Sequence, residues 1–152
     1  MGDFETTVYK GQVNTEVWAS AVVELGKEDV KLFHSIGETF DYLKSLDSDI
    51  VIYYHNLKFD GSFWLSYLLV DAQYKQAAIM PELDEPVDKF EWIPQKEMRN
   101  KTFTYSISDM GQWYRIIIKV NDRLIEIRDS LKLLPFPVKR IGESFKTKLC
   151  IC

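Results

Sequence analysis

Two short polar patterns in the chain could do chemistry together. Asp3 and Glu5 are separated by one residue in a stretch rich in β-branched and aromatic residues. Period-2 alternation would point both carboxylates to one face of a strand and Phe4 to the other. Asn56 and Asp60 lie four residues apart, where one apolar run gives way to another. Paired carboxylates hold hard divalent cations such as Mg²⁺ or Mn²⁺, which commonly serve phosphodiester hydrolysis.

Each pattern also has a simpler interpretation. A D-x-E pair is frequent by chance, and Asp3 and Glu5 would then be two solvated acids. Asp60 is close enough to the start of a predicted helix to be a carboxylate that interacts with the positive end of the helix dipole. The combination favours a metal site, because Asn56 and Asp60 follow a predicted central strand, where open α/β sheets place their sites.

Aromatic side chains and a histidine surround this corner. Tyr53, Phe59 and Phe63 could stack on unpaired bases, a mode of binding that is insensitive to sequence and needs little positive charge. Ordinary core packing is the alternative for at least one or two of them. His55 has no second His or Cys beside it, so a hydrogen bond or a partner contact is favoured over metal ligation.

Composition narrows the class of protein. The chain has 152 residues, 46% of them hydrophobic, and a net charge of −4, which is enough for a core but is not the footprint of a protein that holds duplex DNA by its phosphates. The apolar runs are too short to span a bilayer, and no secretory signal precedes Asp3. Cys150 and Cys152 fit a reducing compartment, and an exposed tail is favoured over a prenylation signal. We therefore expect a cytosolic protein without membrane contact.

The first half of the chain predicts a meander followed by a crossover. Three strands are expected over residues 3–8, 16–25 and 29–36, and a helix over 37–46. The unbroken apolar run at 49–56 is typical of a strand buried on both faces, and a helix between two strands implies a parallel pair. A second helix is expected over 60–72.

The second half predicts an irregular segment and more strands. Residues 70–101 are polar and punctuated by proline, which is typical of an irregular insertion. Strands at 102–108 and 112–131 follow, the latter turning at Asn121-Asp122, and Pro137 lies near the first turn of a short final helix. The fold class is α/β, a mixed sheet with an antiparallel meander and a parallel strand, flanked by helices in one domain spanning residues 1–152.

Four blocks of sequence resemble a known family. "DFETT", "YYHNLKFDGSF", "MGQWY" and "DSLKLLPFPVKRI" occur in the order found in the 3′–5′ exonuclease domain of protein-primed family B DNA polymerases of terminal-protein phages and linear plasmids. The likeness runs from Asp3 to about Phe145. It implies a ribonuclease H-like fold and metal-dependent hydrolysis at the 3′ end of single-stranded DNA.

The resemblance also implies a role for each matching residue. Asp3, Glu5 and Asp60 would be catalytic and would bind Mg²⁺ or Mn²⁺. Three of the matching positions, Tyr53, His55 and Phe63, touch single-stranded DNA or the terminal protein in the family. The residues implied to bind single-stranded DNA are Thr6, Tyr53, His55, Asn56, Phe59, Phe63, Ser130 and Leu131.

The chain departs from the family pattern in one motif. A Tyr-x-x-x-Asp motif is expected beyond the "LPFPVK" block, and the spacing occurs only elsewhere, at Tyr67–Asp71 and Tyr105–Asp109. We therefore expect a domain truncated at both ends, with exonuclease activity weakened or lost. The alternative is a non-catalytic phage or mobile-element protein that binds single-stranded nucleic acid or inhibits a host defence protein. A broken reading frame without a selected function is a third possibility.

Overall fold

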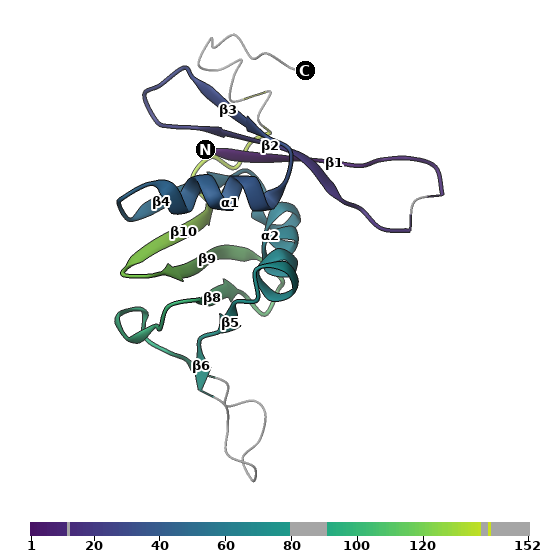
Figure 1. Ribbon diagram of the computed structural model, residues 1–152. Coiled ribbons are helices and arrows are strands. Elements are labelled where there is room, and N and C mark those ends of the chain that lie inside the picture. Colours follow the sequence, from purple (N-terminus) through teal and green to yellow (C-terminus); the bar gives the residue numbers. More distant parts are fainter. Residues whose placement is uncertain (12, 80–90, 138–139, 141–152) are drawn as a thin grey trace.

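Two main β-sheets and two helices make up the computed structural model, which describes residues 1–11, 13–79, 91–137 and 140. The first sheet has the order β1-β2-β3 and the second β4-β10-β9-β8-β5, with β6 and β7 as a separate pair (Figure 1). The elements are β1 Gly2–Thr6, β2 Val17–Val23, β3 Val30–Phe33, α1 Ile36–Ser45, β4 Ile50–Tyr54, α2 Leu57–Ser66, the π-helix η1 Tyr67–Asp71, β5 Lys75–Gln76, β6 Ala78–Ile79, β7 Glu91–Trp92, the 3₁₀ helix η2 Gln95–Glu97, β8 Thr102–Ile107, β9 Trp113–Val120, β10 Arg123–Asp129 and the 3₁₀ helix η3 Ser130–Lys132.

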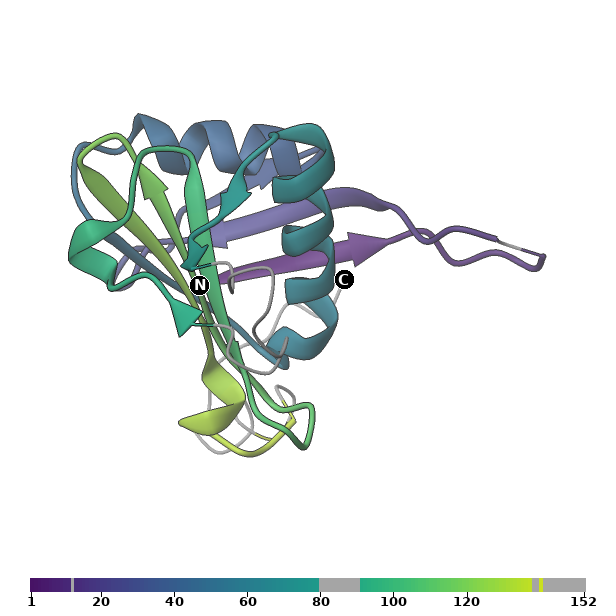
Figure 2. The same cartoon turned by 90° about the horizontal axis from the view of Figure 1, so that it is seen from below.

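The antiparallel meander is confirmed as the first sheet. β2 pairs antiparallel with both β1 and β3. Asp3 and Glu5 lie opposite Ala21 and Ala19, so only methyl groups face the two acids across the ladder. The register shifts between Glu5 and Thr6, and such irregularities re-aim the side chains that follow. The connection between β1 and β2 extends away from the rest of the molecule in both views (Figures 1 and 2).

The predicted first helix is confirmed as α1, and its start has a clear local cause. The Ser35 hydroxyl accepts a hydrogen bond from the Glu38 N–H at 3.1 Å, and the Glu38 carboxylate accepts one from the His34 N–H at 2.8 Å. These bonds satisfy donors that the first turn leaves unpaired. The buried face of the helix carries Phe40 and Leu43.

The predicted mixed sheet is confirmed and has five strands, but two expectations about β4 are wrong. Its parallel partner is β10 rather than a strand of the meander, with Asp129 level with Tyr54. It lies at an edge of its sheet, and its two faces differ, because Tyr54 is fully buried whereas Val51 is 48% exposed. An apolar run alone cannot separate a central strand from an edge strand that is covered by neighbouring elements.

One large apolar cluster joins the helices to the sheets. It includes Phe40 of α1, Trp64 of α2 and Ile127 of β10. α2 comes very close to β9, since a Cβ added at Gly61 would lie 2.7 Å from the Trp113 ring. Figure 2 shows α2 running beside the strands, with α1 next to it. The core therefore fixes where α2, and with it Asn56 and Asp60, lies against the sheet.

The remaining predictions concern the later part of the chain. The turn at Asn121-Asp122 is confirmed, with Asn121 in the left-handed region at φ 52°. Within 70–101 the structure forms only the short elements η1, β5–β7 and η2, and residues 80–90 lie outside the described ranges. The short final helix predicted to begin near Pro137 falls mostly outside them too. No helix among the described residues is long and apolar enough to cross a membrane.

Candidate functional site

Phe4 explains how the two acids beside it reach α2. Its ring is buried, with its centroid 5.1 Å from that of Tyr54 and 5.6 Å from that of Trp64. Trp64 lies one helical turn after Asp60, on the same side of α2. Two residues before Phe4 in the strand, Gly2 has no side chain to keep β1 away from Tyr54, since a Cβ there would lie 2.6 Å from the Tyr54 ring. The packing of Phe4 thus places its neighbours in β1, Asp3 and Glu5, near α2.

Asp3 lies close enough to Asp60 to affect the ionisation of the Asp60 carboxyl. Asp60 is only 3% exposed, and burial together with the charges of Asp3 and Asp129 raises the pKa of its carboxyl to about 7. Desolvation, followed by the charge of Glu5, also raises the pKa of Asp3. Like charges disfavour ionisation of their neighbours in this way. The structure therefore places Asp3 within electrostatic reach of Asp60, and both Asp3 and Glu5 are exposed.

Asp129 belongs to the same group of acids, and the sequence analysis missed it. It ends β10, is 6% exposed, and its Oδ1 accepts hydrogen bonds from the N–H groups of Asn56, at 3.1 Å, and Leu131, at 2.9 Å. Its position was open to inference, because an aspartate directly before a short helical turn is a common capping residue. Its hydrogen bond from the Asn56 N–H depends on the parallel pairing of β4 and β10.

Asn56 forms the corner between β4 and α2. It adopts a left-handed conformation with φ 65°, which asparagine tolerates better than most residues. Its carbonyl accepts a hydrogen bond from the Phe59 N–H at 3.1 Å, but its side chain does not cap the helix. α2 starts at Leu57, so Asp60 lies in its first turn, and the dipole interpretation of that residue fits as well. Asn56 is exposed, whereas Asp60, four residues later, is buried.

The aromatic residues of α2 divide between surface and core. Phe59 is 48% exposed, whereas Phe63 is half-buried and packs against the main apolar cluster. Their ring centroids are 5.2 Å apart at an interplanar angle of 76°. Phe63 thereby supports Phe59 from the side, and Phe59 offers a ring face on which a base could stack.

His55 and Ser130 connect the corner to η3. The Ser130 hydroxyl lies 3.2 Å from the Tyr54 carbonyl oxygen and 3.2 Å from the His55 Nδ1. A carbonyl can only accept, so the single hydroxyl proton of Ser130 goes to Tyr54 and the His55 Nδ1–H donates to Ser130. In neutral His55 this leaves Nε2 as an acceptor. His55 and Asp3 also line a common cavity of about 280 Å³.

The other residues predicted to bind DNA lie on β1, η3 and β4. Thr6 is half-buried directly after the register shift in β1, and Leu131 is half-buried in η3. Tyr53 lies on the opposite face of β4 from Tyr54, and its hydroxyl interacts with Arg128. The structure thus places His55, Asn56, Ser130 and Leu131 together at the end of β4, and Tyr53 points to the other face of that strand.

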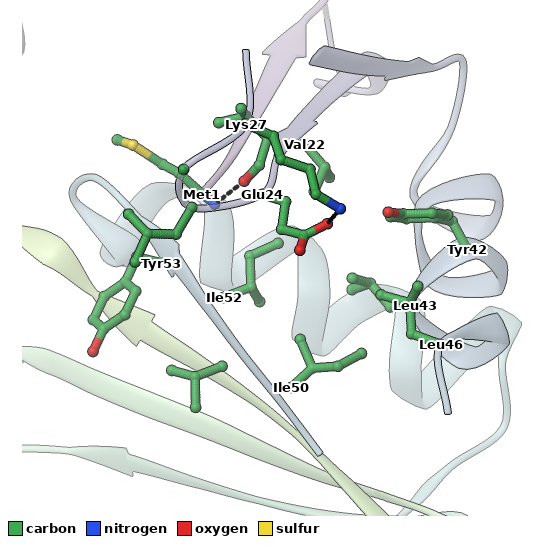
Figure 3. Close-up of a pocket in the computed structure, with 14 residues that line it drawn as sticks. Met1, Val22, Glu24, Lys27, Tyr42, Leu43, Leu46, Ile50, Ile52 and Tyr53 are labelled. Atoms are coloured by element: carbon green, nitrogen blue, oxygen red, sulfur yellow. Dashed lines mark hydrogen bonds and ion pairs between the residues drawn. The ribbon is translucent and has the colours of Figure 1, made fainter. Parts of the chain in front are cut away.

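A larger cavity lies beside Tyr53 and away from the carboxylates. Its volume is about 610 Å³, and it is bounded by the end of β2, by α1 and by β4 (Figure 3). Apolar side chains such as Leu43, Leu46 and Ile52 form much of its wall, and an ion pair of 2.6 Å joins Lys27 and Glu24 on one side. None of the acids of the candidate site lines it.

The acids suit a divalent cation in their chemistry. They offer only oxygen donors, and a cation between them would relieve the repulsion that raises the pKa of Asp60. Their spacing is looser than that of a closed site: within the described ranges, no three His, Cys, Asp or Glu side chains come close enough to hold a metal ion. Asp3, Glu5 and Asp60 are the ligands that the sequence predicts, and in this structure these three do not come close enough to share one ion.

These features define the chain as an α/β domain with an acidic site beside an exposed aromatic ring. Acids from β1 and α2 meet at the carboxyl end of a parallel strand in a mixed α/β sheet, beside an exposed aromatic ring. No protein-family model matches the chain. Relatives among characterised proteins do match, and they agree with this class.

The relatives are phage DNA polymerases. The DNA polymerase of Bacillus phage Nf is 35% identical over 153 residues, covering 97% of this chain and 23% of the polymerase. That of Streptococcus phage Cp-1 is 32% identical over 160 residues, covering 95% and 22%. The chain therefore spans less than a quarter of the length of the relatives it matches.

Solved structures of one such polymerase share the fold. Phi29 DNA polymerase complexed with primer-template DNA matches 99% of this chain and 24% of its own, with a TM-score of 0.75 and 29% identity. The same polymerase complexed with single-stranded DNA matches with a TM-score of 0.72 and 30% identity. The chain is thus homologous to the phi29-like, protein-primed DNA polymerases of phages, and it corresponds to an exonuclease-like region of them.

Proposed function

We propose that this chain holds the 3′ end of single-stranded DNA and hydrolyses its last phosphodiester, at a weakened rate, with the help of Mg²⁺ or Mn²⁺. One observation carries the proposal: Asp60 is buried within the electrostatic reach of Asp3, in the first turn of the helix that also exposes Phe59. A strand end stacked on Phe59 would lie close to these carboxylates. The likeness to a polymerase solved with single-stranded DNA supports the same substrate.

The residues divide the work between holding the DNA and holding the cation. Phe59 would stack on the terminal base. The side-chain amide of Asn56, which does not cap α2, would hydrogen-bond the same base. Ser130 and Leu131 on η3, with His55, would contact the strand further along, and Thr6 and Phe63 would border the terminal nucleotide. Tyr53, on the other face of β4, is the residue that we assign to a protein partner such as the terminal protein.

Asp3, Glu5 and Asp60 would bind the cation. A bound divalent cation supplies an activated water and stabilises the leaving oxygen. Because the pKa of Asp60 is about 7, a proton competes with the cation there near neutral pH, and cation binding should become stronger as the pH rises above 7. The same proposal places the activity in the bacterial cytosol.

A nuclease assay on a 3′-labelled oligonucleotide tests the proposal. We expect label release by the parent in Mn²⁺, and none by an Asp3→Ala, Glu5→Ala double variant. The matched control is Glu28→Ala, Asp29→Ala, which removes the same charge from an exposed turn distant in the sequence from both acidic patterns. Release that continues unchanged in the Asp3, Glu5 double variant would show that these acids do not serve the reaction.

A second candidate function, binding without cleavage, is favoured by the loose spacing of the acids. No three metal-binding side chains in the described part of the chain come close together. In that case fluorescence anisotropy would detect binding of single-stranded DNA by the parent and by the acid variants alike. No label would be released at high protein concentration with Mn²⁺ present.

A further inference from the structure

Asp129 is a buried carboxylate whose bonds join two separate parts of the candidate site. It is 6% exposed, and one of its oxygens accepts two backbone hydrogen bonds, from Asn56 and from Leu131. These two residues are 75 positions apart in the sequence. A buried carboxylate needs such donors, because an unpaired one is costly to keep out of water.

The parallel register explains why one side chain can reach both donors. Asp129 and Tyr54 are level at the carboxyl ends of β10 and β4, which neighbour each other in the sheet (Figure 1). Asn56 begins the corner into α2, and Leu131 lies in η3. The Asp129 carboxylate therefore bridges the exits of two adjacent strands.

The two sides of this bridge carry different DNA-binding residues. Asn56 and Phe59 belong to the β4–α2 corner, whereas Ser130 and Leu131 belong to η3. A weaker second link, the hydrogen bond of the Ser130 hydroxyl to the Tyr54 carbonyl, also connects them. Without the Asp129 bonds the left-handed Asn56 would lose the backbone hydrogen bond made by its own N–H.

We propose that Asp129 is a positioning residue that holds the Asn56 corner and η3 in register, so that both sides grip one single strand of DNA. It acts through the backbone N–H groups of Asn56 and Leu131 and neither contacts the DNA nor binds the cation. The DNA part of this proposal rests on the proposed function, and the bridging part does not.

Three variants test it. Asp129→Ala removes the acceptor, whereas Asp129→Asn keeps an amide oxygen at nearly the same place. Glu126→Ala is the matched control, because it removes a buried acid of the same strand that pairs with Arg115 and Arg128 instead. If the alanine variant does not fold, Asp129→Ser replaces it, since serine still caps η3 but does not reach the Asn56 N–H.

Two measurements are made on each folded variant. Hydrogen exchange by NMR follows the Asn56 and Leu131 amides, and fluorescence anisotropy follows binding of a 5′-labelled oligo-dT in EDTA. We expect Asp129→Ala to speed exchange of both amides and to weaken DNA binding, each about tenfold or more, and Asp129→Asn to restore both to within about threefold. Asp129→Ser should speed exchange at Asn56 alone. Glu126→Ala should lower the unfolding midpoint and change neither readout.

Several outcomes would overturn the proposal. Unchanged exchange at Asn56 in folded Asp129→Ala or Asp129→Ser would refute the bridge. An equal loss of DNA binding in Asp129→Asn and Asp129→Ala, or in Glu126→Ala, would refute the positioning of DNA by the hydrogen bonds. If the parent binds no single-stranded DNA, the proposed function and the DNA part fail together, and the exchange rates still decide whether Asp129 holds the corner.

Discussion

Replacing Asp60 by asparagine should stabilise the protein at alkaline pH. The side chain is almost fully buried, and burial with the charges of Asp3 and Asp129 raises the pKa of its carboxyl from 3.8 to about 7. Asparagine has nearly the same shape and carries no charge. The variant therefore removes the cost of ionising a buried acid and leaves the packing around it largely intact.

The sign and size of the effect follow from linkage. The folded state binds the Asp60 proton more tightly than the unfolded state, so this carboxyl contributes stability below pH 3.8 that is lost as the pH rises through about 7. A rise of this size in the pKa corresponds to about 4 kcal/mol. We expect Asp60→Asn to be more stable than the parent by up to about 4 kcal/mol at pH 8 and to differ little from it at pH 4.

Urea unfolding across this pH range, in EDTA, measures the difference. The four tryptophans supply the fluorescence signal. With a slope of about 2 kcal/mol per molar urea, 4 kcal/mol moves the midpoint by about 2 M. The raised pKa of Asp3 and the lowered pKa of Glu126, the latter held by Arg128 and Arg115 against the cost of burial, affect the parent and the variant alike, so they largely cancel in the comparison.

A stability difference between parent and variant that does not change with pH would refute this reasoning. So would a variant that is less stable than the parent at pH 8. Either result would mean that the Asp60 carboxylate is satisfied by its surroundings when ionised, and that the group of acids does not repel. A carbon-13 NMR titration of the Asp60 carboxyl would confirm which state is present, with an expected midpoint near pH 7.

Two further substitutions test the packing and the DNA surface. Gly61→Ala should destabilise by about 1–3 kcal/mol, because the new Cβ would lie 2.7 Å from the Trp113 ring. Gly37→Ala, whose Cβ would meet nothing closer than 3.5 Å, is its control in urea unfolding, and equal effects of the two would contradict the close contact. Phe59→Ala should weaken binding of single-stranded DNA by about 1–3 kcal/mol and leave the unfolding midpoint nearly unchanged, since the ring is 48% exposed. Val51→Ala, equally exposed on β4, should affect neither, and equal DNA affinities of Phe59→Ala and the parent would contradict the stacking role.

Local patterns predicted the elements that carry the site. Alternation predicted β1 and the side of it that carries Asp3 and Glu5, since neighbouring residues of a strand point to opposite faces. Helical periodicity predicted α1 and α2 because their apolar residues recur every three or four positions. Asp60 was expected near the start of α2, and it lies in the first turn.

Pairings between distant strands could not be predicted in the same way. The apolar run of β4 fits a central strand as well as an edge strand, and only the strand order of the sheet showed that it is an edge strand. Asp129 was missed for the same reason, because its hydrogen-bond partner Asn56 is 73 positions away. Alternation within β4 predicts that Tyr53 points to the opposite face from Tyr54. That this face borders a cavity depends on how α1 and the end of β2 pack against β4.

The sequence by itself determined the chemical types of the site and their local geometry: two acids on one strand face, an acid in the first turn of a helix, and aromatic residues around a strand-to-helix corner. Only the tertiary structure decided that these acids approach each other, that Asp60 is buried with a pKa of about 7, and that Asp129 bridges two strand exits. The reason is physical. Periodicity depends on the backbone of each element, whereas burial and electrostatic coupling depend on which elements pack together, here through Phe4, Tyr54 and Trp64.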